Sequence, residues 1–189
     1  MSKKNILVAA LMVAGIAVSA GASAQTYVAA TVGQAKWNVD CSGAATCSTS
    51  DTAFKLVGGY NFTQNLAAEA GYFSLGKATA SAGNIRGEFK ASGVDIVGVL
   101  KSTPMNGWVG FAKLGVAYVK GETTGYVGNM SGSTSKNSTQ AVAGLGATYQ
   151  VADNVSVRAE YERRDAKVAD FDNAKTTISN LSFGVQYTF

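Results

Sequence analysis

Apolar and polar side chains alternate strictly over the last nine residues of the chain. The apolar set is Leu181, Phe183, Val185, Tyr187 and Phe189, and small or polar residues occupy the positions between them. Successive side chains of a β-strand point to opposite faces, so the pattern predicts a strand with one apolar face and one small or polar face. An aromatic residue ends that strand, as in strands that close a membrane barrel.

The amino-terminal segment is typical of a cleaved export signal. Lys3 and Lys4 precede an apolar stretch at 6–18, and an Ala-Ser-Ala cleavage motif ends at Ala24. The apolar stretch is shorter than the roughly 20 residues that a membrane-spanning helix needs, which argues against an uncleaved anchor. We therefore predict a signal peptide at 1–24 and a single β-barrel domain at 25–189.

The composition suits long paired strands and excludes nucleic acid as a partner. The chain has 22 glycines and one proline, Pro104, and proline removes a ladder hydrogen bond from a strand. Without Lys3 and Lys4, the 16 basic residues become 14 against 12 acidic ones, and no basic run remains. This balance gives no electrostatic basis for nucleic-acid binding.

Turn signals and two-residue periodicity divide the rest of the chain into eight predicted strands. These are 26–37, 52–62, 66–77, 87–101, 108–121, 138–150, 155–167 and 176–189. The connections alternate between short and long: the short ones are 63–65, 102–107 and 152–154, and the long polar ones are 38–51, 78–86, 122–137 and 168–175. This alternation indicates an up-and-down barrel with tight periplasmic turns and extracellular loops.

The charged residues of each predicted strand fall on one parity, opposite the apolar residues. In a soluble barrel the apolar parity would face inward, and the charges would be solvated. Aromatic residues next to the short turns favour the inverted, membrane-embedded arrangement, because they would form an interfacial girdle. This predicted girdle consists of Phe62, Trp108 and Tyr149, together with Tyr187 and Phe189 of the last strand. We therefore predict an all-β, eight-stranded antiparallel transmembrane β-barrel in a bacterial outer membrane.

The inverted arrangement places eight charged side chains in the lumen. They are Lys55, Glu69, Asp95, Lys113, Arg158, Glu160, Glu162 and Arg164, four of each sign. Burying an unpaired charge costs several kcal/mol, so we expect a lumen network of ion pairs. Such a network is either a solid polar core or a gate whose pairs exchange, and the narrow interior of eight strands favours the solid core.

Cys41 and Cys47 are the only cysteines and lie in the first long loop. In an oxidising compartment such a pair predicts a disulfide rather than a metal site.

The chain resembles the OmpA-like transmembrane β-barrel family, the small eight-stranded outer-membrane proteins of Gram-negative bacteria. The likeness rests on 27–33, 58–62, 69–72, 113–118, 158–161 and 184–189. It implies a paired interior that includes Lys113, Arg158 and Glu160, and a terminal signal at Tyr187 and Phe189 that the barrel-assembly machinery reads. We expect no peptidoglycan-binding domain after the barrel, which makes the short adhesin-type members the closer comparison.

No enzymatic site is expected. The chain has no histidine, which hydrolytic nucleophiles and zinc sites usually require, and we expect no cofactor and no metal. Two roles remain: a structural or narrow pore-like, porin-like barrel, and an adhesion or recognition protein that acts through its extracellular loops on a host surface. The expected partners are outer-membrane lipid, including lipopolysaccharide, and the assembly machinery, with the barrel itself a monomer.

Deletion of Phe189 tests the assembly signal. We expect insertion into the membrane of living cells to fall much further than refolding into detergent, because only the cellular route needs the signal to be read. Heat-modifiable migration on SDS gels measures the folded fraction in both settings. An equal loss in both would make Phe189 a packing residue only.

Overall fold

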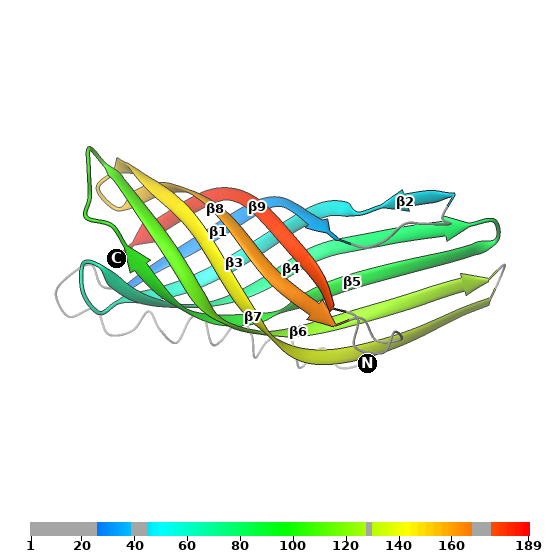
Figure 1. Cartoon of the computed structure of the whole chain (residues 1–189). Coiled ribbons are helices and arrows are strands. Elements are labelled where there is room, and N and C mark those ends of the chain that lie inside the picture. Colours follow the sequence, from blue (N-terminus) through cyan, green and yellow to red (C-terminus); the bar gives the residue numbers. More distant parts are fainter. Residues whose placement is uncertain (1–25, 39–44, 128–129, 168–174) are drawn as a thin grey trace.

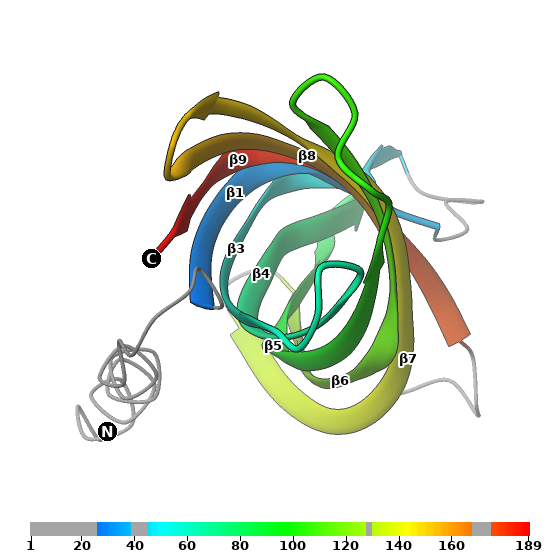
Figure 2. The ribbon, with the colours of Figure 1, turned by 90° about the vertical axis from the view of Figure 1, so that its left-hand side faces the viewer.

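The computed structural model describes residues 26–38, 45–127, 130–167 and 175–189 of the chain. The predicted signal peptide at 1–24 and Cys41 lie outside these described residues. Eight long strands and one short strand form a single sheet that curls into a closed barrel (Figure 1), and Figure 2 shows the ring. The strands are β1 (Thr26–Trp37), β2 (Thr46–Ser48), β3 (Ser50–Asn61), β4 (Leu66–Ala82), β5 (Ile85–Lys101), β6 (Trp108–Val127), β7 (Met130–Ala152), β8 (Val155–Lys167) and β9 (Lys175–Thr188).

Every long strand pairs antiparallel with two neighbours. β1 pairs with both β3 and β9, and pairing of β4 with β5 completes the circle. In the described part of the chain, no helix is long and apolar enough to cross a bilayer. The all-β, eight-stranded fold is confirmed.

The apolar parity of the strands faces outward. Ile96, Leu114 and Leu145 are 65%, 69% and 64% exposed, whereas Val97 and Lys113 on the opposite parity are at most 3% exposed. Exposed apolar side chains all around a sheet are the pattern expected of a wall in contact with lipid.

The prediction of loops at 78–86 and 122–137 is wrong. The β4–β5 ladder continues from Lys77↔Lys90 to Ala82↔Ile85, and the β6–β7 ladder continues to Val127↔Met130. These polar segments resemble loops in sequence because water contacts both of their faces, which removes the apolar alternation that marks a half-buried strand.

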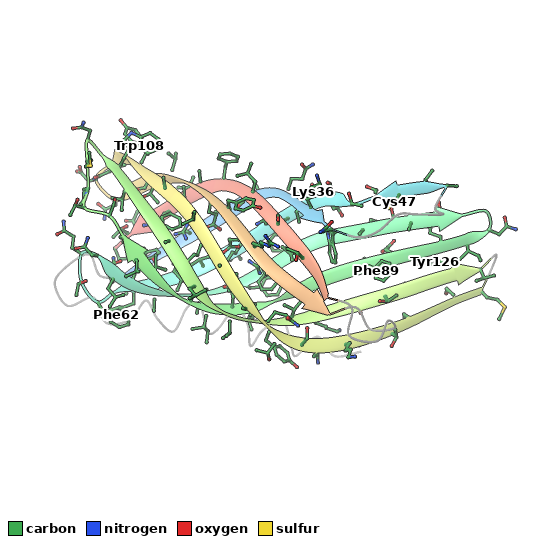
Figure 3. The ribbon with its side chains drawn as sticks, viewed as in Figure 1. Lys36, Cys47, Phe62, Phe89, Trp108 and Tyr126 are labelled. Carbon is green, nitrogen blue, oxygen red and sulfur yellow. The ribbon has the colours of Figure 1, made fainter. Side chains whose placement is uncertain are left out.

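The extended hairpins form a sheet that projects beyond the barrel (Figure 1). β2, which lies within the predicted loop at 38–51, pairs with the outer part of β4. We call this part of the molecule, β2 with 77–91, 120–127 and 130–137, the projecting sheet. Figure 3 shows Cys47, Phe89 and Tyr126 on it, far from Phe62 and Trp108 at the short-turn end.

Two glycines lie at the seam where β1 meets β9. Gly33 pairs with Ser182, and Gly184 pairs with Thr31. A Cβ on Gly33 would overlap the carbonyl oxygen of Leu181, and a Cβ on Gly184 would overlap that of Ala30. The close approach of the two backbones at this closing seam therefore requires glycine.

Replacement of Gly184 by alanine should destabilise the closed barrel by about 1–3 kcal/mol, because the added methyl group forces the seam strands apart. The measurement is the temperature at which the fast-migrating folded form converts to the slow form on SDS gels. Gly125 is the matched control, since it lies in the projecting sheet with nothing within 4 Å of an added Cβ. If Gly125→Ala and Gly184→Ala shifted the conversion equally, the steric account of the seam would be wrong.

Candidate functional site

Charged side chains from five strands meet in the middle of the lumen. Lys55, Glu69, Asp95 and Lys113 come from β3, β4, β5 and β6, one from each. β8 supplies the other four, Arg158, Glu160, Glu162 and Arg164, at alternate positions. Each of the eight is at most 3% exposed. We call these eight side chains the lumen network.

Lys113 lies at the centre of the lumen network. Its Nζ is 2.7 Å from Glu160 Oε2, 2.9 Å from Glu162 Oε1 and 3.6 Å from Glu69 Oε2. One ammonium group carries three N–H donors, so Lys113 joins the two halves of the network.

The half nearer the extracellular end contains Lys55, Asp95, Glu162 and Arg164. Lys55 Nζ lies 2.7 Å from both Asp95 Oδ2 and Glu162 Oε1. Arg164 donates to Glu162 and lies 3.6 Å from Asp95 Oδ2. Two positive and two negative charges therefore cancel within this half.

The half nearer the short turns contains Glu69, Arg158 and Glu160. Arg158 Nη2 donates to both carboxylate oxygens of Glu69, at 2.8 and 3.0 Å, and its Nε donates to Glu160 at 2.9 Å. The Tyr27 hydroxyl donates to Glu69 Oε1 at 2.8 Å. With Lys113 counted here, this half is also neutral.

Sequence reasoning missed the rings that flank the network. The Phe73 centroid lies 3.9 Å from Arg164 Cζ, and the Phe111 centroid lies 4.5 Å from Arg158 Cζ, so both rings form cation–π contacts with the guanidinium groups. Tyr27, Phe73 and Phe111 share the parity of the charges, and the interior is therefore not purely polar as the sequence predicted. Their inward parity was the only feature of the sequence that could have identified these three rings as lumen residues.

The lumen differs on the two sides of the network. On the extracellular side lies an apolar layer of buried side chains that includes Trp37, Leu75, Val119 and Ile178. On the short-turn side lies a cavity of about 410 Å³ lined by residues that include Tyr27, Lys101 and Arg158. Glu69 and Arg158 of the lumen network form part of the wall of this cavity.

The predicted girdle residues are exposed around the short-turn end. The rings of Trp108 and Tyr149 lie 4.8 Å apart, and those of Tyr187 and Phe189 lie 5.1 Å apart. Phe62 lies 5.3 Å from Tyr60. Such paired rings suit a membrane–water interface.

A second charged cluster lies on the outward face of the projecting sheet. Glu88 Oε1 is 2.9 Å from Lys90 Nζ, and Glu88 Oε2 is 3.6 Å from Lys77 Nζ and 3.8 Å from Arg86 Nη2. The hydrogen bond from Lys90, with added attraction from Lys77, holds the pKa of Glu88 below its ordinary value. Arg86, Glu88 and Lys90 occupy alternate positions of β5, and the pairing of β4 with β5 adds Lys77. Sequence reasoning found no charge cluster here because it placed 78–86 in a loop, where alternate residues share no face.

Cys47 lies in β2. Because Cys41 lies outside the described residues, the disulfide between them stays a prediction. Within the ranges that the structure describes, no group of three or more Cys, Asp or Glu side chains is arranged to hold a metal ion.

A closed sheet with an apolar outside, a charged inside and one aromatic girdle defines a small outer-membrane β-barrel. The OmpA-like transmembrane domain matches residues 21–189, so the chain belongs to that family. Its place is the outer membrane, which it crosses with strands. The family is typically non-enzymatic. Among curated proteins, none matches the chain in sequence.

Solved structures with the same fold are distant in sequence. Neisserial surface protein A is 18% identical with a TM-score of 0.62, and the match covers 89% of this chain and 99% of that one. Ail of Yersinia pestis, in complex with the heparin analogue sucrose octasulfate, is 19% identical with a TM-score of 0.55, covering 87% and 99%. OprG of Pseudomonas aeruginosa is 14% identical with a TM-score of 0.53, covering 89% and 98%.

Glu162 offers a test of the lumen network. Replacing it by glutamine removes the carboxylate that Lys55, Lys113 and Arg164 share, so the folded barrel should lose about 3–5 kcal/mol. Urea-induced unfolding in lipid vesicles measures the loss. Glu122→Gln is the control, since that exposed carboxylate lies 3.7 Å from Lys120 and contributes about 0–1 kcal/mol. Equal stability of the two variants would contradict a tightly paired network.

Proposed function

We propose that this protein is a recognition barrel that binds polyanionic glycans at the cell surface through the outward face of its projecting sheet. The proposal depends on one observation: Lys77, Arg86 and Lys90 cluster around the carboxylate of Glu88. Lys120 and Glu122 lie on the same face of β6, with Glu122 opposite Lys90. Four positive charges against two negative charges leave an excess that sulfate or phosphate groups complement. The cations stay accessible, with side chains 46–57% exposed.

The lumen supports this role over the structural or pore-like role that the sequence also allowed. Its eight charges cancel among themselves, and an apolar layer lies between them and the extracellular side. A lumen that the charge network and the apolar layer close above the short-turn cavity leaves the outer surfaces as the parts that interact. The same reasoning favours a protein without enzymatic activity or a cofactor.

The Ail complex suggests the probe. The structure of that protein was solved with a heparin analogue. At this low sequence identity, the two proteins are shown to share the fold alone. Heparin is a dense polyanion of the kind that an excess of exposed Lys and Arg attracts.

Cells that display this protein should bind immobilised heparin, and the triple variant K77Q/R86Q/K90Q should bind at least about tenfold less because the excess positive charge is lost. Binding should weaken with salt. It should hold from pH 7 to about 5, since the lowered pKa of Glu88 keeps its charge constant over that range.

Lys136→Gln is the matched control, because Lys136 pairs with Gly121 on the other face of the sheet. Full heparin binding by the triple variant would overturn the proposal. Discrete single-channel steps in planar bilayers, together with no heparin binding, would instead favour the pore-like role.

A further inference from the structure

Two cations flank a serine on the outer wall of β1, β9 and β8. Lys36 pairs with Ser179, and Ser179 pairs with Arg163. Paired residues share a face, and the neighbours of both cations point into the lumen: Ala35 and Trp37 beside Lys36, Glu162 and Arg164 beside Arg163. Lys36 and Arg163 therefore point outward, with their Cα atoms about 10 Å apart across two strand spacings.

Neither cation has a carboxylate partner among the side chains that the structure describes: no Asp or Glu oxygen of that set lies within 4.0 Å of Lys36 or Arg163, in contrast to the cations around Glu88. Figure 3 shows Lys36 on the outside of the wall, near the point where the barrel gives way to the projecting sheet. Two outward cations that pair with none of the described carboxylates favour an anionic partner.

An apolar groove adjoins the cations. It has a volume of about 550 Å³ and is lined by Gly33, Gln34, Lys36, Tyr161, Ser179, Leu181 and Phe183. Leu181 and Phe183 follow Ser179 along β9 toward the short turns and are 50% and 59% exposed. The groove thus has a cationic, hydroxyl-bearing end toward the outside and an apolar end toward the membrane interior.

This polarity matches one class of molecule. A charged side chain is costly in the hydrocarbon core and reaches for the headgroup level. Along a phosphorylated lipid, the phosphate comes first and the acyl chain follows toward the membrane interior. Along the groove, the cations come first and the apolar wall follows in the same direction. Arg binds phosphate through paired N–H donors, and Lys adds a point charge.

We propose that this groove is a binding site for one phosphorylated lipid of the outer leaflet. Lys36 and Arg163 bind its phosphate groups, the Ser179 hydroxyl donates to a phosphate oxygen, and an acyl chain lies along Leu181 and Phe183. The site is separate from the glycan surface on the projecting sheet, and neither proposal depends on the other.

The test uses the full mature protein, refolded in phosphocholine micelles and titrated with bis-phosphorylated lipid A. Binding is followed through the backbone amide signals of Ser179 and Leu181. The variant K36Q/R163Q should bind lipid A at least about tenfold more weakly, because two charge-assisted contacts to phosphate are lost. K36R should retain binding, and K90Q, on the projecting sheet, should leave it unchanged. Heat-modifiable migration shows that each variant is folded.

Two further ligands distinguish affinity for the phosphate group from affinity for the acyl chains. Dephosphorylated lipid A should bind as weakly as the double variant binds lipid A, and inorganic phosphate at the same concentration should not shift the Leu181 signal. Unchanged lipid A binding by K36Q/R163Q would overturn the site. Equal binding of dephosphorylated lipid A would reduce it to a nonspecific apolar wall, and equal binding of inorganic phosphate would make it a free-anion site; either result refutes the proposal.

Discussion

Backbone hydrogen bonding is the constraint on which the rest of this structure depends. A bilayer interior offers no water to an unpaired N–H or C=O, so a strand wall there must have no edge. β1 meets this demand by pairing with β3 on one side and β9 on the other, although β9 lies at the opposite end of the chain from β1. Glycine at 33 and 184 lets the backbones approach at that closing seam.

Closure of the sheet then decides where every side chain goes. Where the outside faces the hydrocarbon core, charged residues can be only in the lumen, and the narrow interior of eight strands makes unpaired charges there costly. The lumen network follows: four cations and four anions in two neutral halves that Lys113 joins. The aromatic rings over Arg158 and Arg164 fill the space beside them.

Outside the membrane, the sheet no longer has to be closed, because water can hydrogen-bond to the backbone groups of an open edge. Beyond the rim, β4–β7 continue as a ladder whose two faces both meet water, and this freedom lets polar and basic residues occupy either face. The cations around Glu88 lie on this ladder, and Lys36 and Arg163 lie on the outer wall of β1 and β8. Both groups are open to partners, whereas the lumen charges satisfy one another. We infer that the interactions of this protein take place on its outside.

The sequence by itself determined the period of each strand and the parity of its charges. These are local properties, because successive side chains alternate whatever the strand pairs with, and they were sufficient to predict eight strands, their order and the eight lumen charges. They were not sufficient to show that 78–82, 85–86, 122–127 and 130–137 are strands, since a segment with water on both faces shows no alternation of apolar and polar residues. Only the tertiary structure decided which charges meet: Glu69 and Arg158 lie 89 residues apart, and Lys55 and Glu162 lie 107 apart. Register and the stagger of the closed sheet set those encounters, and both are properties of the whole ring that no single strand contains.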